Sequence, residues 1–144
     1  DQPLYEHLSV EENVGIPLRA RGESKLDIAQ RVSEMLGSLQ LSNIANRRAS
    51  QLSGGERRRV AIGRATIVKP RVLLLDEPLV SLDQELKESI ATLIRQVHNE
   101  IGATTLFVTH DQNEAKDFGD RVVTMEDLNS NTPKKSPLNP KIQG

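Results

Sequence analysis

Two adjacent acids, Asp76 and Glu77, follow directly after the apolar run Val72–Leu75. A short apolar run between Pro70 and Pro78 is typical of a strand buried in a parallel sheet, and burying charge beside it would be costly. Both carboxylates can lie in a solvated loop, which requires no function. Alternatively, the pair serves phosphoryl transfer: Asp76 would help to hold Mg²⁺ through water, and Glu77 would polarise the attacking water.

A histidine follows the second apolar run, Thr104–Thr109. A single histidine at the end of a strand is more often structural than functional. If the two strands are neighbours, however, His110 would emerge beside Asp76 and Glu77. An imidazole in that place can donate a hydrogen bond to a γ-phosphate oxygen and so report the presence of ATP.

Paired glycines begin a helical pattern in the segment Leu52-Ser53-Gly54-Gly55-Glu56. Their backbone N–H groups can point at an anion, the helix N-terminus adds a positive dipole end, and Ser53 adds a hydroxyl donor. The same residues also match a capping box, because Glu56 stands three residues after Ser53. Both interpretations can hold at once. The arginines that follow are expected to lie mostly on a solvated helix face; they are Arg57, Arg58, Arg59 and Arg64.

Helices and apolar strands alternate along the chain and would position these motifs. Helical spacing predicts helices over residues 24–38, 56–68, 84–101 and 111–118. Apolar runs predict strands over residues 71–76, 104–109 and 121–125. Residues 1–22 are expected to form loop and short irregular structure, and residues 43–51 a polar connection. The alternation predicts an α/β fold with a parallel sheet, which binds its ligands at the carboxyl ends of the strands.

The composition restricts the class of protein. Hydrophobic residues make up 36% of the 144 residues and aromatic residues only 2%, so the core must be built from aliphatic side chains. The net charge of −1 argues against nucleic acid as a partner. There is no cysteine, which fits a reducing compartment, and no apolar stretch is long enough to span a bilayer.

In order and spacing, these segments together resemble the ATP-binding-cassette (ABC) ATPases. Leu52–Ala65 is similar to the signature motif of that family and the helix after it, and Arg71–Pro78 is similar to its Walker B motif. Ser81–Asp83 stands where the D-loop belongs and Val108–Asp111 where the H-loop belongs. Asp120–Met125 resembles the last core strand.

The resemblance implies a P-loop NTPase-like parallel sheet with a helical signature subdomain. It covers residues 1–125, with the signature subdomain over about 9–68 and the Walker B, D-loop and H-loop core over about 69–125. Residues 126–144, rich in Asn, Pro, Ser and Lys, are expected to be an extended or mobile tail.

The resemblance also implies an ATPase that uses ATP and Mg²⁺ in a head-to-tail dimer. Glu77 and His110 would be catalytic and Asp76 would bind the metal. A second set would contact the ATP of the partner subunit, in trans: Ser53, Gly54, Gly55, Glu56 and Asp83. The implied partners are a second ATPase subunit, transmembrane permease subunits and a solute-binding protein. The implied location is cytoplasmic, on the inner face of the cell membrane.

The sequence departs from the family pattern in the motifs that precede the signature segment. It contains no Gly-x-x-x-x-Gly-Lys-Ser/Thr loop, since no glycine is followed by lysine. The Walker A strand and the N-terminal β-subdomain are therefore expected to be missing, and the isolated chain is expected to be inactive. Residues 4–14 and 132–140 resemble the corresponding segments of importer ATPase subunits. Two functions remain open: part of a catalytic importer ATPase, or a truncated module that binds a partner without turnover.

Overall fold

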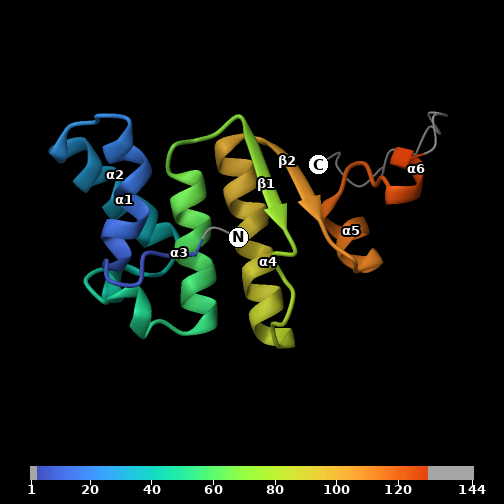
Figure 1. Ribbon diagram of the computed structural model, residues 1–144, viewed down its shortest axis with the longest axis horizontal. Coiled ribbons are helices and arrows are strands. Elements are labelled where there is room, and N and C mark those ends of the chain that lie inside the picture. Colours follow the sequence, from blue (N-terminus) through green and yellow to red (C-terminus); the bar gives the residue numbers. More distant parts are fainter. Residues whose placement is uncertain (1–2, 130–144) are drawn as a thin grey trace.

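The computed structural model describes residues 3–129. The fold is α/β, as predicted, and helices α1, α2 and α3 gather at one end of the molecule (Figure 1). The two strands lie beside α4, with α5 and α6 beyond them (Figure 1). In chain order the elements are α1 (Val10–Ala20), α2 (Lys25–Ser38), η1 (Ser42–Ile44), η2 (Ala49–Gln51), α3 (Gly54–Thr66), β1 (Val72–Asp76), α4 (Gln84–Ile101), β2 (Thr104–Val108), α5 (Gln112–Phe118) and α6 (Met125–Asn129).

The sheet consists of β1 and β2 in parallel, with Leu74 paired to Leu106 in the centre of the register. Side chains alternate between its two faces. Leu73 and Leu75 face α4, as does Phe107, and His98 of α4 lies 2.9 Å from the Thr105 hydroxyl. The prediction that both faces are buried is wrong for residues 3–129. α4 covers one face, whereas Val72, Leu74, Leu106 and Val108 on the other face are exposed.

Helix α1 contradicts the prediction that the first 22 residues are irregular. Ser9 caps the helix in a capping box: the Ser9 hydroxyl accepts from the Glu12 N–H at 3.1 Å, and the Glu12 carboxylate accepts from the Ser9 N–H at 2.7 Å. Pro17 is accommodated inside the helix. The fully buried side chain of Asn13 binds both the N–H and the carbonyl of Tyr5, which fixes the preceding loop.

The predicted strand over residues 121–125 is also wrong. Residues 121–124 have no regular structure, and Met125 begins the short helix α6. Thr124 explains the helix start, because its hydroxyl accepts from the Asp127 N–H at 3.2 Å and donates to the Asp127 carboxylate at 2.7 Å. Most of the predicted tail, residues 130–144, lies outside the described residues.

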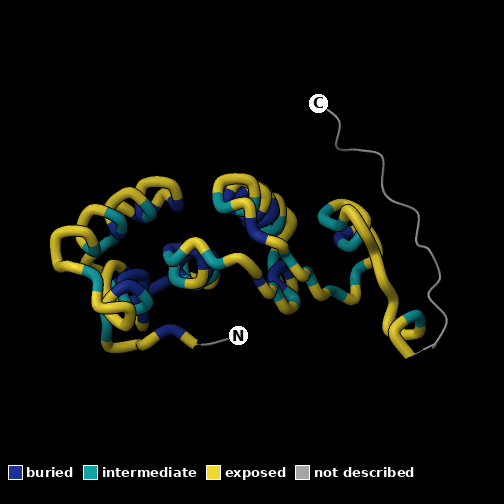
Figure 2. Tube along the Cα trace, turned by 90° about the horizontal axis from the view of Figure 1, so that it is seen from above, coloured by how far each residue is buried: buried dark blue, intermediate teal, exposed yellow. Residues whose placement is uncertain are grey.

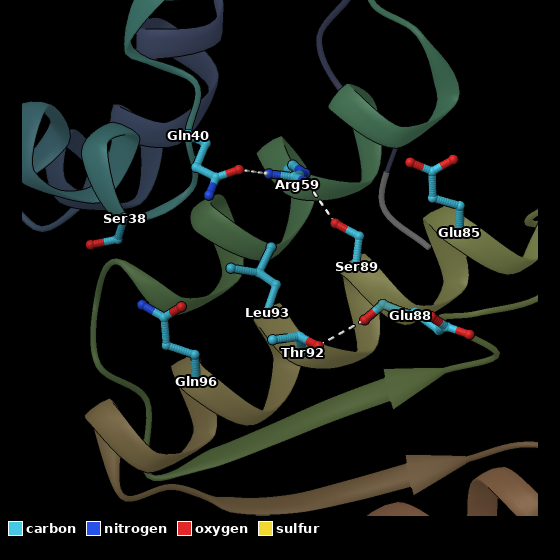
Figure 3. A pocket seen from close by; sticks show the side chains of 9 residues that line it. All are labelled: Ser38, Gln40, Arg59, Glu85, Glu88, Ser89, Thr92, Leu93 and Gln96. Carbon is cyan, nitrogen blue, oxygen red and sulfur yellow. Dashed lines mark hydrogen bonds between the residues drawn. The ribbon is translucent and has the colours of Figure 1, made fainter.

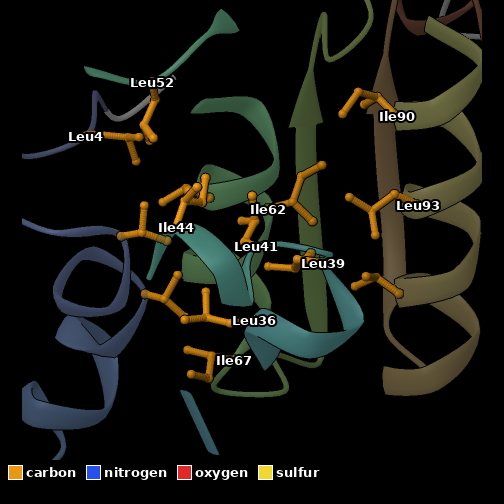
Figure 4. Packing of buried hydrophobic residues seen from close by; sticks show 14 of the residues in the cluster. Leu4, Leu36, Leu39, Leu41, Ile44, Leu52, Ile62, Ile67, Ile90 and Leu93 are labelled. Carbon is orange, nitrogen blue, oxygen red and sulfur yellow. The ribbon is translucent and has the colours of Figure 1, made fainter. Parts of the chain in front are cut away.

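The core is aliphatic, as the composition predicted, and runs from the helical end to the inner face of α4 (Figures 2 and 4). Val14 and Leu18 of α1 meet Leu39 and Val60 there, and all four are fully buried. Ile90 continues the core onto α4. None of the helices described over residues 3–129 has the length and apolar character to cross a membrane.

Candidate functional site

The carboxyl ends of β1 and β2 bring Glu77 and His110 together, as expected if the two strands are neighbours. The Glu77 N–H donates to the Val108 carbonyl at 2.9 Å, which ties the end of β1 to β2. The Glu77 Oε1 accepts from the backbone N–H of His110 at 3.1 Å and lies 2.8 Å from the His110 Nδ1. One carboxylate oxygen therefore holds both the backbone and the ring of the histidine.

The contact between these two residues changes the electrostatics of the histidine. Its hydrogen bond to the Glu77 carboxylate raises the pKa of His110 above the ordinary value, and the negative charge of Glu77 adds to the effect. The contact stabilises the charged form of the ring relative to a free histidine, while the His110 side chain stays 75% exposed. A charged imidazole facing solvent at a strand end can donate to an anion.

Glu77 is also held in an unusual backbone conformation, with φ of +47°. This left-handed region costs a residue with a side chain about 1–2 kcal/mol. The hydrogen bonds to Val108 and His110 hold Glu77 there. Such outliers cluster at functional sites, where the strain aims a side chain.

Asp76 ends β1 with an exposed side chain that makes no hydrogen bond or ion pair within residues 3–129. The same residues include no cluster of three or more His, Cys, Asp or Glu side chains that could hold a metal ion. A free carboxylate still fits Mg²⁺, because that ion is commonly bound by one or two carboxylates together with waters and substrate phosphates.

A second network behind His110 was not predicted from the sequence. Lys87 of α4 lies 2.6 Å from the Glu114 carboxylate and 3.4 Å from that of Asp111. Glu114 is buried and also accepts from the Thr109 hydroxyl at 2.6 Å. Asp111 caps α5, so the loop that carries His110 is fixed on both sides. These residues are distant in sequence, so the network becomes visible only when the positions of β2 and α4 are known.

The segment at the start of α3 forms the capping box that the sequence allowed. The Glu56 N–H donates to the Ser53 hydroxyl at 3.3 Å, and the Ser53 N–H donates to the Glu56 carboxylate at 2.8 Å. The latter bond is the main cause that lowers the pKa of Glu56, and Arg47 at 3.2 Å acts in the same direction. Ser53 and Gly54 remain exposed.

Asp83 caps α4 in a similar way, accepting from the Leu86 N–H at 3.0 Å. The N-termini of α3 and α4 point toward the same end of the molecule as the carboxyl ends of β1 and β2 (Figure 1). The strand that ends at Asp76, next to Glu77, thus runs toward the end of the molecule at which α3 and α4 begin, although these are separate segments of the sequence.

The prediction of a solvated arginine face is wrong. Arg57 forms an ion pair with Glu6 and donates to the Ala49 carbonyl at 2.7 Å. Arg64 donates to the Pro3 carbonyl at 3.1 Å and its guanidinium lies over the Tyr5 ring. Arg58 and Arg59 are half-buried and donate to backbone carbonyls. These side chains hold neighbouring segments against α3.

Comparison with known proteins supports the resemblance. The sequence model of the ABC transporter family matches residues 1–80. The trehalose import ATP-binding protein SugC of Mycobacterium tuberculosis is 48% identical over 122 residues, which cover 85% of this chain and 31% of that protein. The spermidine/putrescine import ATP-binding protein PotA of Ruegeria pomeroyi is 46% identical over 124 residues, covering 86% of this chain and 34% of that protein.

The sulfate/thiosulfate import ATP-binding protein CysA of Synechococcus elongatus is 44% identical over 122 residues, covering 85% of this chain and 36% of that protein. The chain thus spans about one third of the length of these curated relatives. Since the family model matches more than half of the chain, the chain belongs to the ABC transporter family.

Proposed function

We propose that this chain is part of the ATP-binding subunit of an ABC importer and that it couples ATP hydrolysis to solute transport. The observation that carries the proposal is the Glu77–His110 pair, joined at 2.8 Å across the carboxyl ends of two parallel strands, beside the free carboxylate of Asp76. Ligands of parallel α/β sheets bind at this edge. The relatives described above are all named as import ATP-binding proteins, which supports import.

Within its own subunit, the chain would supply the residues nearest to the reacting phosphate. Glu77 would accept a hydrogen bond from the attacking water and polarise it. His110, whose ring is exposed and whose pKa is raised by the contact with Glu77, would donate to the γ-phosphate. Asp76 would help to hold Mg²⁺, which neutralises charge on the phosphates when bound.

Toward a partner subunit, the chain would supply donors at two helix N-termini. Ser53 and Gly54 are exposed at the start of α3, and the helix dipole favours an anion there. Gly55 and Glu56 shape the same turn, and Asp83 stands at the start of α4. These residues would contact the ATP held by the second subunit. Docking on permease subunits would place the protein on the cytoplasmic face of the membrane.

Mixed dimers of the complete subunit test whether Glu77 serves the site of its own subunit and Ser53 that of the partner. A dimer with Glu77→Gln on one chain keeps one intact site, formed by Glu77 of the other chain and the signature segment of the Glu77→Gln chain. Adding Ser53→Ala to the Glu77→Gln chain should damage that remaining site. Adding Ser53→Ala to the opposite chain should leave it intact. ATP turnover that is equal in the two arrangements would contradict the proposal.

A further inference from the structure

Helices α3 and α4 approach each other closely at their first turns. A Cβ atom added at Gly55 would lie 2.7 Å from Cδ1 of Leu86, well inside normal contact distance. Gly55 is one of the signature residues, and Leu86 stands three residues after Asp83. The absence of a side chain at Gly55 thus lets the two helix N-termini pack directly against each other.

Arg59 continues the contact one turn further along α3. Its Nη2 donates to the Ser89 hydroxyl of α4 at 2.7 Å, and its Nη1 donates to the Leu39 carbonyl and to the Gln40 side chain, both at 3.1 Å (Figure 3). A single guanidinium therefore joins α3, α4 and the C-terminal end of α2. The planar fork of arginine suits this task because its donors are fixed relative to one another.

Arg58 provides a third link, from α3 to the segment between β1 and α4. It donates to the Val80 carbonyl at 3.2 Å, and the Val80 N–H donates to the Glu77 carbonyl at 3.3 Å. Ser81, the next residue, has φ of +59°, so the backbone bends sharply there before Asp83. The link thus holds a turn that leads directly from Glu77 to the start of α4.

We propose that Arg59, through Ser89, is a positioning residue that fixes Ser53 and Asp83 in one arrangement, so that both contact the partner's nucleotide as a single surface. This inference rests on the proposed function. The hydrogen bond from Arg58 to the Val80 carbonyl and the close approach of Gly55 to Leu86 support the same arrangement of α3 and α4. Each of the two capping residues begins a helix, and the helices are tied within their first two turns.

Ser89→Ala removes the acceptor on α4 with little change in volume, and Ser89→Thr retains a hydroxyl. Thr92→Ala is the matched control, because the Thr92 hydroxyl stands one turn further along α4 and donates only to the Glu88 carbonyl of its own helix, at 2.9 Å (Figure 3). All three are tested in dimers of the complete subunit with Glu77→Gln on one chain.

We expect Ser89→Ala to lower ATP turnover about tenfold when it is on the Glu77→Gln chain, as for the loss of a hydrogen bond to a charged group. On the opposite chain it should change turnover by less than about twofold, and Ser89→Thr should restore activity. Arg59→Lys should show the same dependence on the chain, because lysine lacks the fork.

The result that overturns the inference is equal turnover in the two arrangements for Ser89→Ala, or the same loss with Thr92→Ala, since a purely structural role would affect both chains alike. Ser53→Ala in the same dimers separates this failure from a failure of the proposed function. If the effect of Ser53→Ala on ATP turnover depends on which chain carries it and the effect of Ser89→Ala does not, only the positioning role is refuted. If neither depends on the chain, the proposed function fails.

Discussion

Ser53 and Ser9 occupy equivalent capping boxes, which allows the structural and functional roles of Ser53 to be separated. In both, the serine hydroxyl accepts from the N–H of the residue three positions later, and the serine N–H donates to the carboxylate of that glutamate. Ser53→Ala and Ser9→Ala each remove the hydroxyl and leave the glutamate contact. Ser9 lies on α1, outside the residues proposed to contact nucleotide.

The loss of a serine cap costs about 0.5–2 kcal/mol in the free energy of unfolding. Helix α3 starts with Gly54 and Gly55, and glycine is less favourable than alanine in a helix by about 1 kcal/mol. Helix α3 therefore depends on its cap more than α1 does. We expect Ser53→Ala to cost about 1.5 kcal/mol and Ser9→Ala about 1 kcal/mol.

Urea unfolding of the 144-residue chain measures both costs. With an m-value of about 2 kcal/mol/M, the midpoints should fall by about 0.5–0.8 M with unchanged m. In the complete subunit, Ser9→Ala should leave ATP turnover within about twofold, whereas loss of a preorganised donor at Ser53 should lower it about 100-fold. Equal turnover in the two variants would refute the reasoning, because Ser53 would then be a cap alone.

Three further predictions follow from the structure. NMR titration should give His110 a pKa above 6.5, and the pKa should return toward the ordinary value in Glu77→Gln. Because the pKa is raised in the folded state, the stabilisation from the charge pair is fully present below pH 6.5 and is lost as pH rises through the folded pKa. Calorimetry with ATP and Mg²⁺ should detect no micromolar binding to the 144-residue chain, since it lacks a Walker A loop; micromolar binding that Asp76→Asn abolishes would contradict this. Light scattering should show self-association of the isolated chain through its exposed apolar sheet face, weakened by Leu74→Thr with Leu106→Thr, whereas the exposed Leu26→Thr on α2 should have no effect; a monomer at all concentrations would contradict this.

The elements that local residues determine were predicted well from the sequence. Helix α4 has the predicted bounds, because Asp83 caps it and Gly102, with φ of +61°, ends it. The contact between Glu77 and His110 was predicted on the condition that the two strands are neighbours, and the parallel pairing of β1 with β2 meets that condition.

Other features depend on partners that the sequence does not reveal. Residues 121–125 have the composition of a strand, but a strand needs a neighbour, and the cap that Thr124 offers favours a short helix instead. The capping box at Ser9 and Glu12 could have identified the start of α1 from the sequence, and the helix accommodates Pro17 in its interior. The partners of Arg59 and Lys87 lie on other elements, so only the tertiary structure shows them.

We propose that Glu77 polarises the attacking water while Asp76 and the phosphate contacts hold the nucleotide. The most direct test is a parallel measurement of ATP binding and ATP hydrolysis by the complete subunit with Glu77→Gln, with Glu85→Gln as the control, since Glu85 is an exposed acid in the first turn of α4. We predict binding within about twofold of the unchanged subunit and hydrolysis lower by about 10²–10⁴-fold. Unchanged turnover in Glu77→Gln, or an equal loss in Glu85→Gln, would show that Glu77 does not polarise the attacking water.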